Sequence, residues 1–250
     1  MSESNKMSDV EREYNFFGGA KRLWGGEGRW GVSSELMERA REFSDISPLG
    51  VAAPDFSGTL LNGKSVSLSQ FRNDSNLFIM FGSISDPPCV SNMRTSKPSL
   101  VQLHEKYCDK GIEFLFIYTR EGHPGENVPP HESIEQKRAN ALRFKEELNV
   151  PFPILVDRLD GDVHKKYGLL NNATFLVNRA GIVVYKSMFL DASELPSVFD
   201  DLLVWESLDD GSKPMKKSYS ERIRLCQAAY DPASRELEME VLKRNGPHIP

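Results

Sequence analysis

Apolar and polar residues follow one another along the middle of the chain in the order expected for alternating strands and helices. Residues 77–81 form a continuous apolar run, which predicts a strand covered on both faces, and residues 112–118 predict a second buried strand. Apolar side chains recur on one side of residues 91–107 and 134–148, which predicts a helix in each segment. Pro98 should kink the first helix or mark a late start. The side of the second helix predicted to face the core carries Ile134, Ala141, Leu142 and Leu148. This alternation predicts a central parallel βαβ unit.

Hairpins and short elements are predicted on either side of this unit. Asn62-Gly63 is a strong hairpin signal between residues 55–61 and 64–68, and residues 173–178 and 182–186 form a second predicted hairpin. The remaining elements are a strand at 153–157, a helical turn at 163–167 and a closing helix at 193–205. The sequence therefore predicts an α/β fold, with a central mixed sheet flanked by helices.

The two ends of the chain carry a different pattern and are predicted to be extensions of this domain. Glycines interrupt residues 1–30, so we expect an irregular segment there, packed onto the body through Trp24 and Trp30. A short helix should follow, and a second helix is predicted at 233–243. The predicted organisation is an N-terminal extension at 1–50, a main domain at 51–207 and a C-terminal helical extension at 208–250.

Net charge and cysteine content exclude several classes of protein. The formal net charge is −5, which argues against a protein held on nucleic acid or on an acidic membrane by basic residues. No apolar run is long enough to span a bilayer and the polar N-terminus has no signal core, so we predict a cytoplasmic protein. The three cysteines, Cys89, Cys108 and Cys226, lie far apart, which predicts neither a disulfide framework nor a zinc site. We predict no metal and no cofactor, and any redox activity would rest on one thiol.

The clearest candidates for chemistry follow the first buried strand. Asp86 and Cys89 lie where this strand ends and a helix begins, a place where ligands gather in open α/β sheets and where a helix N-terminus favours anions. Asp86 has three interpretations: a helix cap before Pro87, a general acid or base paired with His123, and a carboxylate nucleophile. Cys89, one helical turn beyond Asp86, is either a reactive thiol or a small core residue.

The long loop predicted at 119–130 and the segment after it carry three further candidates. His123 follows the second buried strand, where it could shuttle protons near neutral pH. Glu121 orients His123 or is solvated, and His131 contributes to the site or caps the following helix. A metal site made of Asp86, Glu121, His123 and His131 is an alternative, although their spacing matches no metal motif.

Several of these segments resemble known families. Asp86-Pro87-Pro88-Cys89, after a buried strand, is similar to the Cys-Pro-Pro-Cys site of the thioredoxin superfamily, with Asp86 in the place of the first cysteine. Residues 53–56 (Ala-Pro-Asp-Phe), with the hairpin that follows, resemble the opening segment of the peroxiredoxin and thiol-reductase branches. These resemblances imply a thioredoxin-like fold for the main domain.

A closer resemblance is to the iodothyronine deiodinase family. Residues 81–88 (Phe-Gly-Ser-Ile-Ser-Asp-Pro-Pro) are similar to the family signature Phe-Gly-Ser-Cys-Thr-Sec-Pro-Pro, and two later motifs follow in the same order at 116–124 and 130–135. Asp86 takes the place of the selenocysteine and Ile84 that of a cysteine, so deiodination through a selenolate is not expected. The resemblance points to a homodimer as well. The positions that carry over to the family's reaction centre are Glu121, His123 and His131.

We therefore predict an enzyme that retains a deiodinase-like pocket and acts on a small organic molecule by non-redox acid–base chemistry. Asp86 and His123 would form the pair for proton transfer, elimination, isomerisation or cyclisation, with Glu121 and His131 orienting them. One alternative is a thiol oxidoreductase in which Cys89 reduces a peroxide, disulfide or halide with an external thiol. Another is a non-catalytic binding or scaffold protein. The residues predicted to bind the substrate are Ser83, Ser85, Trp24 and Trp30.

Overall fold

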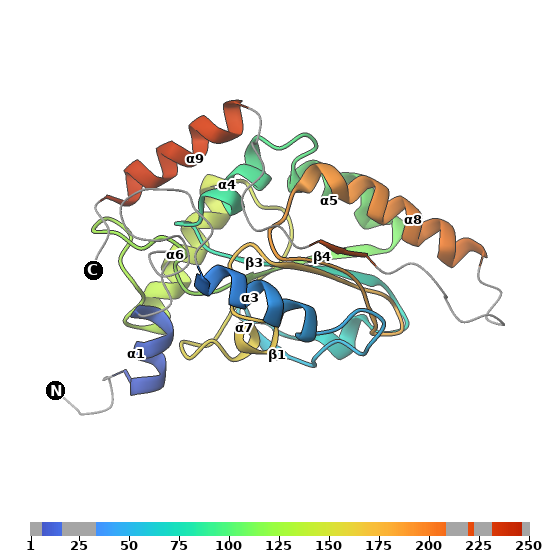
Figure 1. Ribbon diagram of the computed structural model, residues 1–250, viewed down its shortest axis with the longest axis horizontal. Coiled ribbons are helices and arrows are strands. Elements are labelled where there is room, and N and C mark those ends of the chain that lie inside the picture. The colour runs from blue at the N-terminus through green and yellow to red at the C-terminus, as the bar shows by residue number, and fades with distance from the viewer. Residues whose placement is uncertain (1–6, 17–33, 209–219, 223–231, 247–250) are drawn as a thin grey trace.

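The computed structural model describes residues 7–16, 34–208, 220–222 and 232–246, which contain one mixed sheet of eight strands. The strands are β1 (Ser57–Leu60), β2 (Ser65–Ser67), β3 (Asn76–Gly82), β4 (Ile112–Tyr118), β5 (Ile154–Val156), β6 (Thr174–Val177), β7 (Val183–Ser187) and β8 (Ser220–Arg222). They lie in the order β2-β1-β5-β4-β3-β6-β7-β8, with β3 and β4 near the centre (Figure 1). β3, β4 and β5 are parallel to one another, whereas β1 and β6 run antiparallel to the strands beside them.

Strands β3 and β4 form the predicted central pair, and their carboxyl ends meet. They pair in parallel from Asn76 opposite Ile112 to Gly82 opposite Tyr118. Every residue of β3 is buried, as expected for a strand covered on both faces of the sheet. This is the thioredoxin-like α/β fold that the sequence predicts, and it brings the segments after Gly82 and Tyr118 together.

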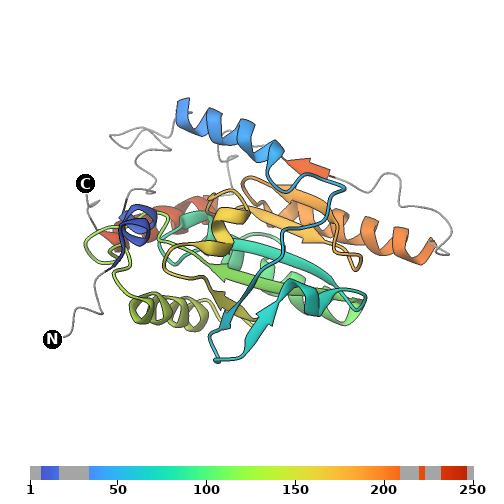
Figure 2. The same ribbon diagram turned by 90° about the horizontal axis from the view of Figure 1, so that it is seen from below.

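Helices cover both faces of the sheet, and each face has its own apolar core. The helices are α1 (Asp9–Phe16), α3 (Ser34–Asp45), α4 (Pro87–Arg94), α5 (Leu100–Tyr107), α6 (Ile134–Glu147), α7 (Asp162–Lys166), α8 (Leu195–Leu208) and α9 (Pro232–Asn245), with 3-10 turns η2 (Leu68–Phe71), η3 (Cys108–Lys110) and η4 (Ala192–Glu194). One core lies between the sheet and helices α4, α5, α6, α8 and α9, and includes Phe144 and Phe199. The other lies under α3 and α7, which Figure 2 shows on their own side of the sheet, and includes Phe43 and Val163. In these ranges, no helix combines the length and the apolar character needed to cross a bilayer.

The helix predicted at 91–107 is two helices and begins earlier than predicted. Two prolines occupy the first turn of α4, where a missing backbone N–H costs nothing. α4 ends before Pro98, because a proline ring does not fit a helix interior. Ser99 then starts α5, since its hydroxyl accepts the backbone N–H of Gln102 at 3.3 Å. Cys89 therefore lies in the first turn of a separate short helix.

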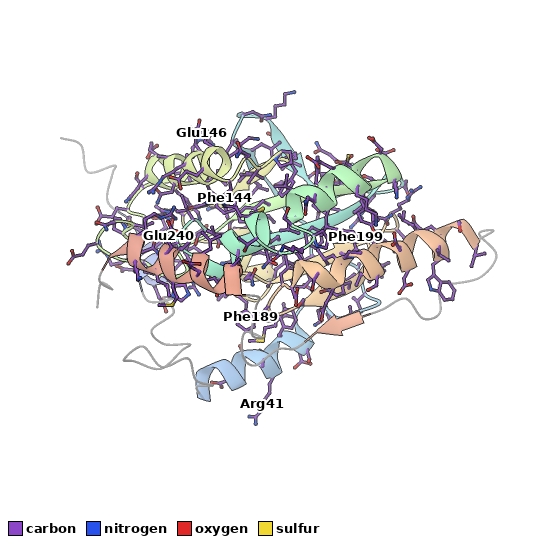
Figure 3. The ribbon with its side chains drawn as sticks, turned by 90° about the horizontal axis from the view of Figure 1, so that it is seen from above. Arg41, Phe144, Glu146, Phe189, Phe199 and Glu240 are labelled. Atoms are coloured by element: carbon purple, nitrogen blue, oxygen red, sulfur yellow. The ribbon has the colours of Figure 1, made fainter. Side chains whose placement is uncertain are left out.

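The inward side of α6 differs from the prediction at one position. Ala141 and Leu148 are buried as predicted, but Leu142 is 47% exposed. Phe144 takes the core position instead, because residues 141, 144 and 148 are spaced three and four apart and share one side of a helix. Figure 3 shows Phe144 on the sheet side of α6 and Glu146 on its outer side.

The described parts of the two extensions contain elements that the sequence did not indicate. The N-terminal segment predicted to be irregular contains helix α1, because the glycines that disfavour a helix begin only after it. Tyr14 anchors α1, with its hydroxyl 2.8 Å from Nδ1 of His164. In the C-terminal extension, β8 joins the sheet beside β7, in addition to the predicted helix, which is α9. Trp24 and Trp30 lie outside the described residues.

Candidate active site

Two loops meet at the carboxyl ends of β3 and β4. The loop at 83–86 follows β3, and the loop at 119–133 follows β4. Asn171, which precedes β6, lies beside Gly122 together with Asp86. The last turn of α9 contacts both loops. Four segments that are distant in sequence therefore form one site.

The side chains of Asp86 and Cys89 are in direct contact at the start of α4. Asp86 is the N-cap residue of the helix, and the first-turn backbone N–H of Cys89 faces its carboxylate and lowers the pKa of this group. The Cys89 thiol also donates to Oδ2 of Asp86, with sulfur and oxygen 2.6 Å apart. The carboxylate therefore has a thiol partner in addition to the helix terminus.

The Cys89 sulfur lies against the backbone of β3 and is fully buried. It is 3.6 Å from the carbonyl oxygen of Phe81 and 3.9 Å from Oδ1 of Asn172. Gly82 makes room for it, because a Cβ atom at that position would overlap the sulfur. The lack of a side chain at Gly82 therefore allows the thiol to pack against the end of β3.

Burial changes the protonation of both groups. It raises the pKa of Asp86 to about 7 and outweighs the lowering effect of the hydrogen bonds from the thiol and the backbone N–H of Cys89. Burial, and next to it the charge of Asp86, raises the pKa of the Cys89 thiol well above its usual value. Above about pH 7 the pair therefore consists of a protonated thiol and a carboxylate that can accept its proton.

His123 lies beside this pair. Its Nε2 atom is 3.9 Å from Oδ1 of Asp86, which is longer than a hydrogen bond. Its backbone N–H donates to Oγ of Ser85 at 3.2 Å. The structure brings the predicted pair of Asp86 and His123 to one place, but the carboxylate is in closer contact with Cys89.

Glu121 and His131 form a second, fully buried centre in the same loops. Nε2 of His131 lies 2.8 Å from Oε1 of Glu121, which also accepts the hydroxyl of Tyr118 at 2.7 Å. Asn140 of α6 donates to the same oxygen at 3.1 Å. Ser85 donates to the other oxygen through its amide, at 3.1 Å, and its hydroxyl, at 2.5 Å. This carboxylate therefore ties the loops after β3 and β4 to α6.

These donors keep Glu121 ionised. Burial alone would raise its pKa, but the hydrogen bond and charge of His131, with the hydrogen bonds from Ser85 and Tyr118, lower the pKa to about 2. Burial lowers the pKa of His131, although the hydrogen bond to Glu121 opposes this. We assign a charged Glu121 that accepts a hydrogen bond from Nε2 of His131. The four side chains considered as metal ligands form two separate pairs, Asp86 with His123 and Glu121 with His131. The described residues contain no group of three or more side chains that could hold a metal ion.

Ser83 and Ser85 are fully buried and connect the two loops. Oγ of Ser83 accepts the backbone N–H of Gly122 at 3.0 Å. Oγ of Ser85 accepts the backbone N–H of His123 while its own proton goes to Glu121. Both hydroxyls are engaged within the protein, and their contacts position the two loops.

Helix α9 supplies donors to both loops and lies beside α4 in Figures 1 and 3. Arg244 donates to the carbonyl oxygen of Ile84 at 3.0 Å. Asn245 donates to the carbonyl oxygens of Ser85 and His123 at 3.0 and 3.2 Å. The C-terminal helix is therefore part of the site.

Tyr118, Asn140, Arg244 and Asn245 are not singled out by sequence reasoning, and the first two leave a local signal. Tyr118 carries a hydroxyl at the end of an otherwise apolar strand, and Asn140 lies next to the inward-facing Ala141 on α6. Arg244 and Asn245 leave none, because they reach the site from 160 residues away along the chain. Asn172 lies 83 residues from Cys89, and its signal is the thioredoxin-like resemblance, in which Asn171-Asn172 occupies the place of a cis-proline.

Comparison with known proteins gives a family match and several relatives. The model of the Redoxin family matches residues 48–201. The thiol-disulfide oxidoreductase ResA of Bacillus thuringiensis is 26% identical over 137 residues, covering 54% of this chain and 67% of the relative. ResA of Geobacillus thermodenitrificans is 27% identical over 136 residues, covering 54% and 66%. The thioredoxin domain of a thiol-disulfide oxidoreductase from Bacteroides vulgatus aligns with a TM-score of 0.49 and 21% identity, covering 62% of this chain and 97% of that one.

The matches correct the predictions drawn from the deiodinase resemblance. The assignment to the iodothyronine deiodinases is wrong, because the chain matches the Redoxin family and relatives named thiol-disulfide oxidoreductase. The motifs behind that assignment are short and lie at strand ends that belong to the wider fold. Non-redox acid–base catalysis by Asp86 and His123 is wrong on the same findings. The prediction that the protein is an enzyme agrees with these matches. The resemblance of residues 53–56 to thiol reductases agrees with the family match, whereas the resemblance to deiodinases does not.

Proposed function

The chain belongs to the Redoxin family, and from this premise we propose that it is a thiol-disulfide oxidoreductase with Cys89 as its redox thiol. Two relatives named thiol-disulfide oxidoreductase ResA support this class of reaction. The observation that carries the proposal is the 2.6 Å contact between Sγ of Cys89 and Oδ2 of Asp86. It pairs a thiol with a base whose pKa of about 7 suits proton transfer at neutral pH.

In the first half of the reaction, Cys89 takes one sulfur from a substrate disulfide. Asp86 accepts the thiol proton as the Cys89 sulfur attacks one substrate sulfur, and a new S–S bond forms between them. The substrate's own S–S bond breaks, and its electron pair leaves with the second sulfur. That thiolate takes the proton from Asp86 and departs as a thiol. Cys89 is then oxidised to a mixed disulfide, and the departing half of the substrate is reduced.

A second thiol must release Cys89, and an external thiol fits this role. Among the described residues the other free thiol is Cys108 in η3, which precedes the start of β4. Cys89 lies at the opposite end of the β3–β4 pair. A strand of seven residues spans about 20 Å, so Cys108 does not reach the mixed disulfide. Cys226 lies outside the described residues.

The second half of the reaction returns Cys89 to its starting state. The external thiol gives its proton to Asp86 and attacks the substrate sulfur of the mixed disulfide. A new S–S bond joins the external thiol to that half of the substrate, and the bond to Cys89 breaks. The Cys89 thiolate leaves with the electron pair and takes the proton back from Asp86. One external thiol is oxidised in this step, and a further one completes the reduction of the substrate in solution.

The start of α4 supports the thiolate that forms in both halves. Cys89 is in the first turn of this helix, where unpaired amides and the helix dipole favour negative charge. Backbone N–H groups of Ser83 and Asn172 face the sulfur and lower the pKa of the thiol. These donors offset part of the effect of burial.

Burial argues for a small substrate. Cys89 is fully buried, Asp86 is 4% exposed and His123 is 8% exposed. A protein disulfide needs wide access to the attacking sulfur, in line with its S–S bond, and a buried thiol does not offer that access. We therefore take the substrate to be a low-molecular-weight disulfide. A cytoplasmic location, a homodimer, and substrate contacts by Ser83 and Ser85 stay predictions.

Replacing Cys89 with serine is expected to abolish turnover, because serine cannot form the mixed disulfide. The assay follows the reduction of bis(2-hydroxyethyl) disulfide by glutathione, coupled to glutathione reductase and loss of NADPH. Cys108→Ser is the matched control and should keep the wild-type rate, since this thiol lies at the other end of the strands. Turnover that survives in Cys89→Ser would overturn the proposed function.

A further inference from the structure

Asn172 is a fully buried residue beside the Cys89 sulfur, and half of its side-chain amide is unused. Its Oδ1 atom lies 3.9 Å from Sγ of Cys89. Among the described residues, its Nδ2 atom has no hydrogen-bond partner. A buried N–H group without a partner costs free energy, so a partner is expected in at least one state of the protein.

The backbone of Asn172 is fixed, so only its side chain is free to respond. Its N–H donates to the carbonyl oxygen of Phe81 at 2.8 Å, and its own carbonyl accepts the N–H of Leu190 at 3.1 Å. Its φ of 65° lies in the left-handed region, which asparagine and glycine tolerate better than other residues. The fixed backbone therefore keeps the side-chain amide next to the sulfur, where it can rotate but not move away.

The present orientation of the amide suits a thiol. An oxygen faces the sulfur while Cys89 carries its proton. An oxygen facing a thiolate would instead be repelled, because both atoms are electron-rich. The two ends of an amide have nearly the same shape, so a half-turn of the side chain places the NH2 group where the oxygen was.

We propose that Asn172 is a hydrogen-bond donor to the Cys89 thiolate, turning its NH2 group to the sulfur when the proton has moved to Asp86. This inference rests on the proposed function, because that function requires the thiolate to form. It explains the unused Nδ2 atom, which gains a charged acceptor in the reactive state. It also gives a chemical role to the residue before β6 that contacts the sulfur.

A change at position 172 leaves the other charged groups around the sulfur in place. They come from the start of α4, from β4, from the loop after β4 and from α9. They are Asp86, which contacts the sulfur, together with Tyr118, Glu121, His123, Glu238 and Arg244, which contact other groups of the site. A shift in the titration of Cys89 in Asn172→Gly, which adds no charge, therefore reports the amide itself.

The test is the rate at which iodoacetamide alkylates Cys89 between pH 6 and 11.5, followed by mass spectrometry of the peptide that contains Cys89. Asn172→Gly removes the amide and keeps the left-handed backbone, and Asn172→Asp keeps the shape but replaces the donor with a charge. We expect both variants to be slower at pH 7, by about tenfold for glycine, and their pH midpoints to move upward. A role in structure alone would lower stability without moving the midpoint.

Asn73→Gly is the matched control, because Asn73 also has a left-handed backbone, with φ of 66°, and lies before β3, at the end of that strand away from Cys89. It should keep the wild-type midpoint. An unchanged midpoint in Asn172→Gly overturns the inference, while the glutathione assay separately decides the proposed function. If the Asn172→Gly substitution shifts the midpoint but the wild-type protein does not turn over a disulfide, Asn172 keeps its role as a donor and the proposed function is overturned.

Discussion

Replacing Asp86 with asparagine is expected to slow the reaction of Cys89 with a small disulfide at pH 7 by about 10²–10⁴-fold, the usual contribution of a general base. Asparagine has the same shape and can still accept the thiol hydrogen bond that Oδ2 now accepts. It cannot take the proton, because an amide oxygen is not a base in water. The measurement is the rate of mixed-disulfide formation, followed by mass spectrometry of samples quenched with acid.

The pH profile of the same variant tests the assignment of the base. Because burial raises the pKa of Asp86 to about 7, the wild-type rate should rise as the pH increases through about 7 and Asp86 becomes able to accept a proton. This rise should be absent from Asp86→Asn. A variant that keeps the wild-type profile would contradict the role of Asp86.

The substitution should also make the protein more stable, which separates loss of the base from unfolding. The pKa of Asp86 is about 7 in the folded protein, against 3.8 for an aspartate side chain in water, so ionisation of Asp86 opposes folding. Stability should therefore fall as the pH rises from about 4 to about 7. The difference between the two pKa values corresponds to at most about 4 kcal/mol, which Asp86→Asn should recover at neutral pH.

Replacing Glu121 with glutamine is expected to lower the free energy of unfolding by about 3 kcal/mol at pH 7. The pKa of Glu121 is about 2 in the folded protein, below the ordinary glutamate value of 4.5, so the carboxylate stabilises the fold above about pH 4.5. That contribution is lost as the pH falls towards 2. The carboxylate accepts hydrogen bonds from His131, Tyr118, Asn140 and Ser85. Glutamine replaces one of its oxygens with an NH2 group, so the donors on that side lose their acceptor. Urea unfolding at pH 7 measures the difference.

Glu126→Gln is the matched control for this prediction. Glu126 lies in the same loop and is exposed, so its amide should change the free energy of unfolding by less than about 0.5 kcal/mol. Equal stability of Glu121→Gln and Glu126→Gln would contradict the account of the buried carboxylate. The wild-type protein should also lose stability between pH 4.5 and 2 more steeply than Glu121→Gln.

The central strands and the place of the site follow from sequence, because they depend on local patterns. The strand predicted at 112–118 has the same bounds in the structure, because the apolar residues that identify it are those of the strand itself. Pro98 marks a true break, because its ring acts on the adjacent backbone. The α/β class follows from the order of these elements, and the resemblances at residues 86–89 and 53–56 imply its thioredoxin-like form.

The partners within the site do not follow from sequence, because they depend on how distant segments meet. Glu121 contacts His131 only because the loop after β4 folds back, and no periodic pattern describes that loop. Asn245 reaches the loops because α9 packs beside α4. The family assignment failed for a similar reason. Short motifs at strand ends gave the deiodinase resemblance, whereas the Redoxin match extends over residues 48–201.

The formation of a covalent intermediate on Cys89 is the most direct test of the thiol mechanism. The protein is mixed with bis(2-hydroxyethyl) disulfide in the absence of other thiols, quenched with acid, and examined by mass spectrometry before and after digestion. The account predicts one 2-hydroxyethanethiol group in disulfide linkage to Cys89 within the time of one turnover, removed by added glutathione and absent from Cys89→Ser. Consumption of the disulfide with no adduct on Cys89, or an adduct that forms only on another cysteine, would contradict it.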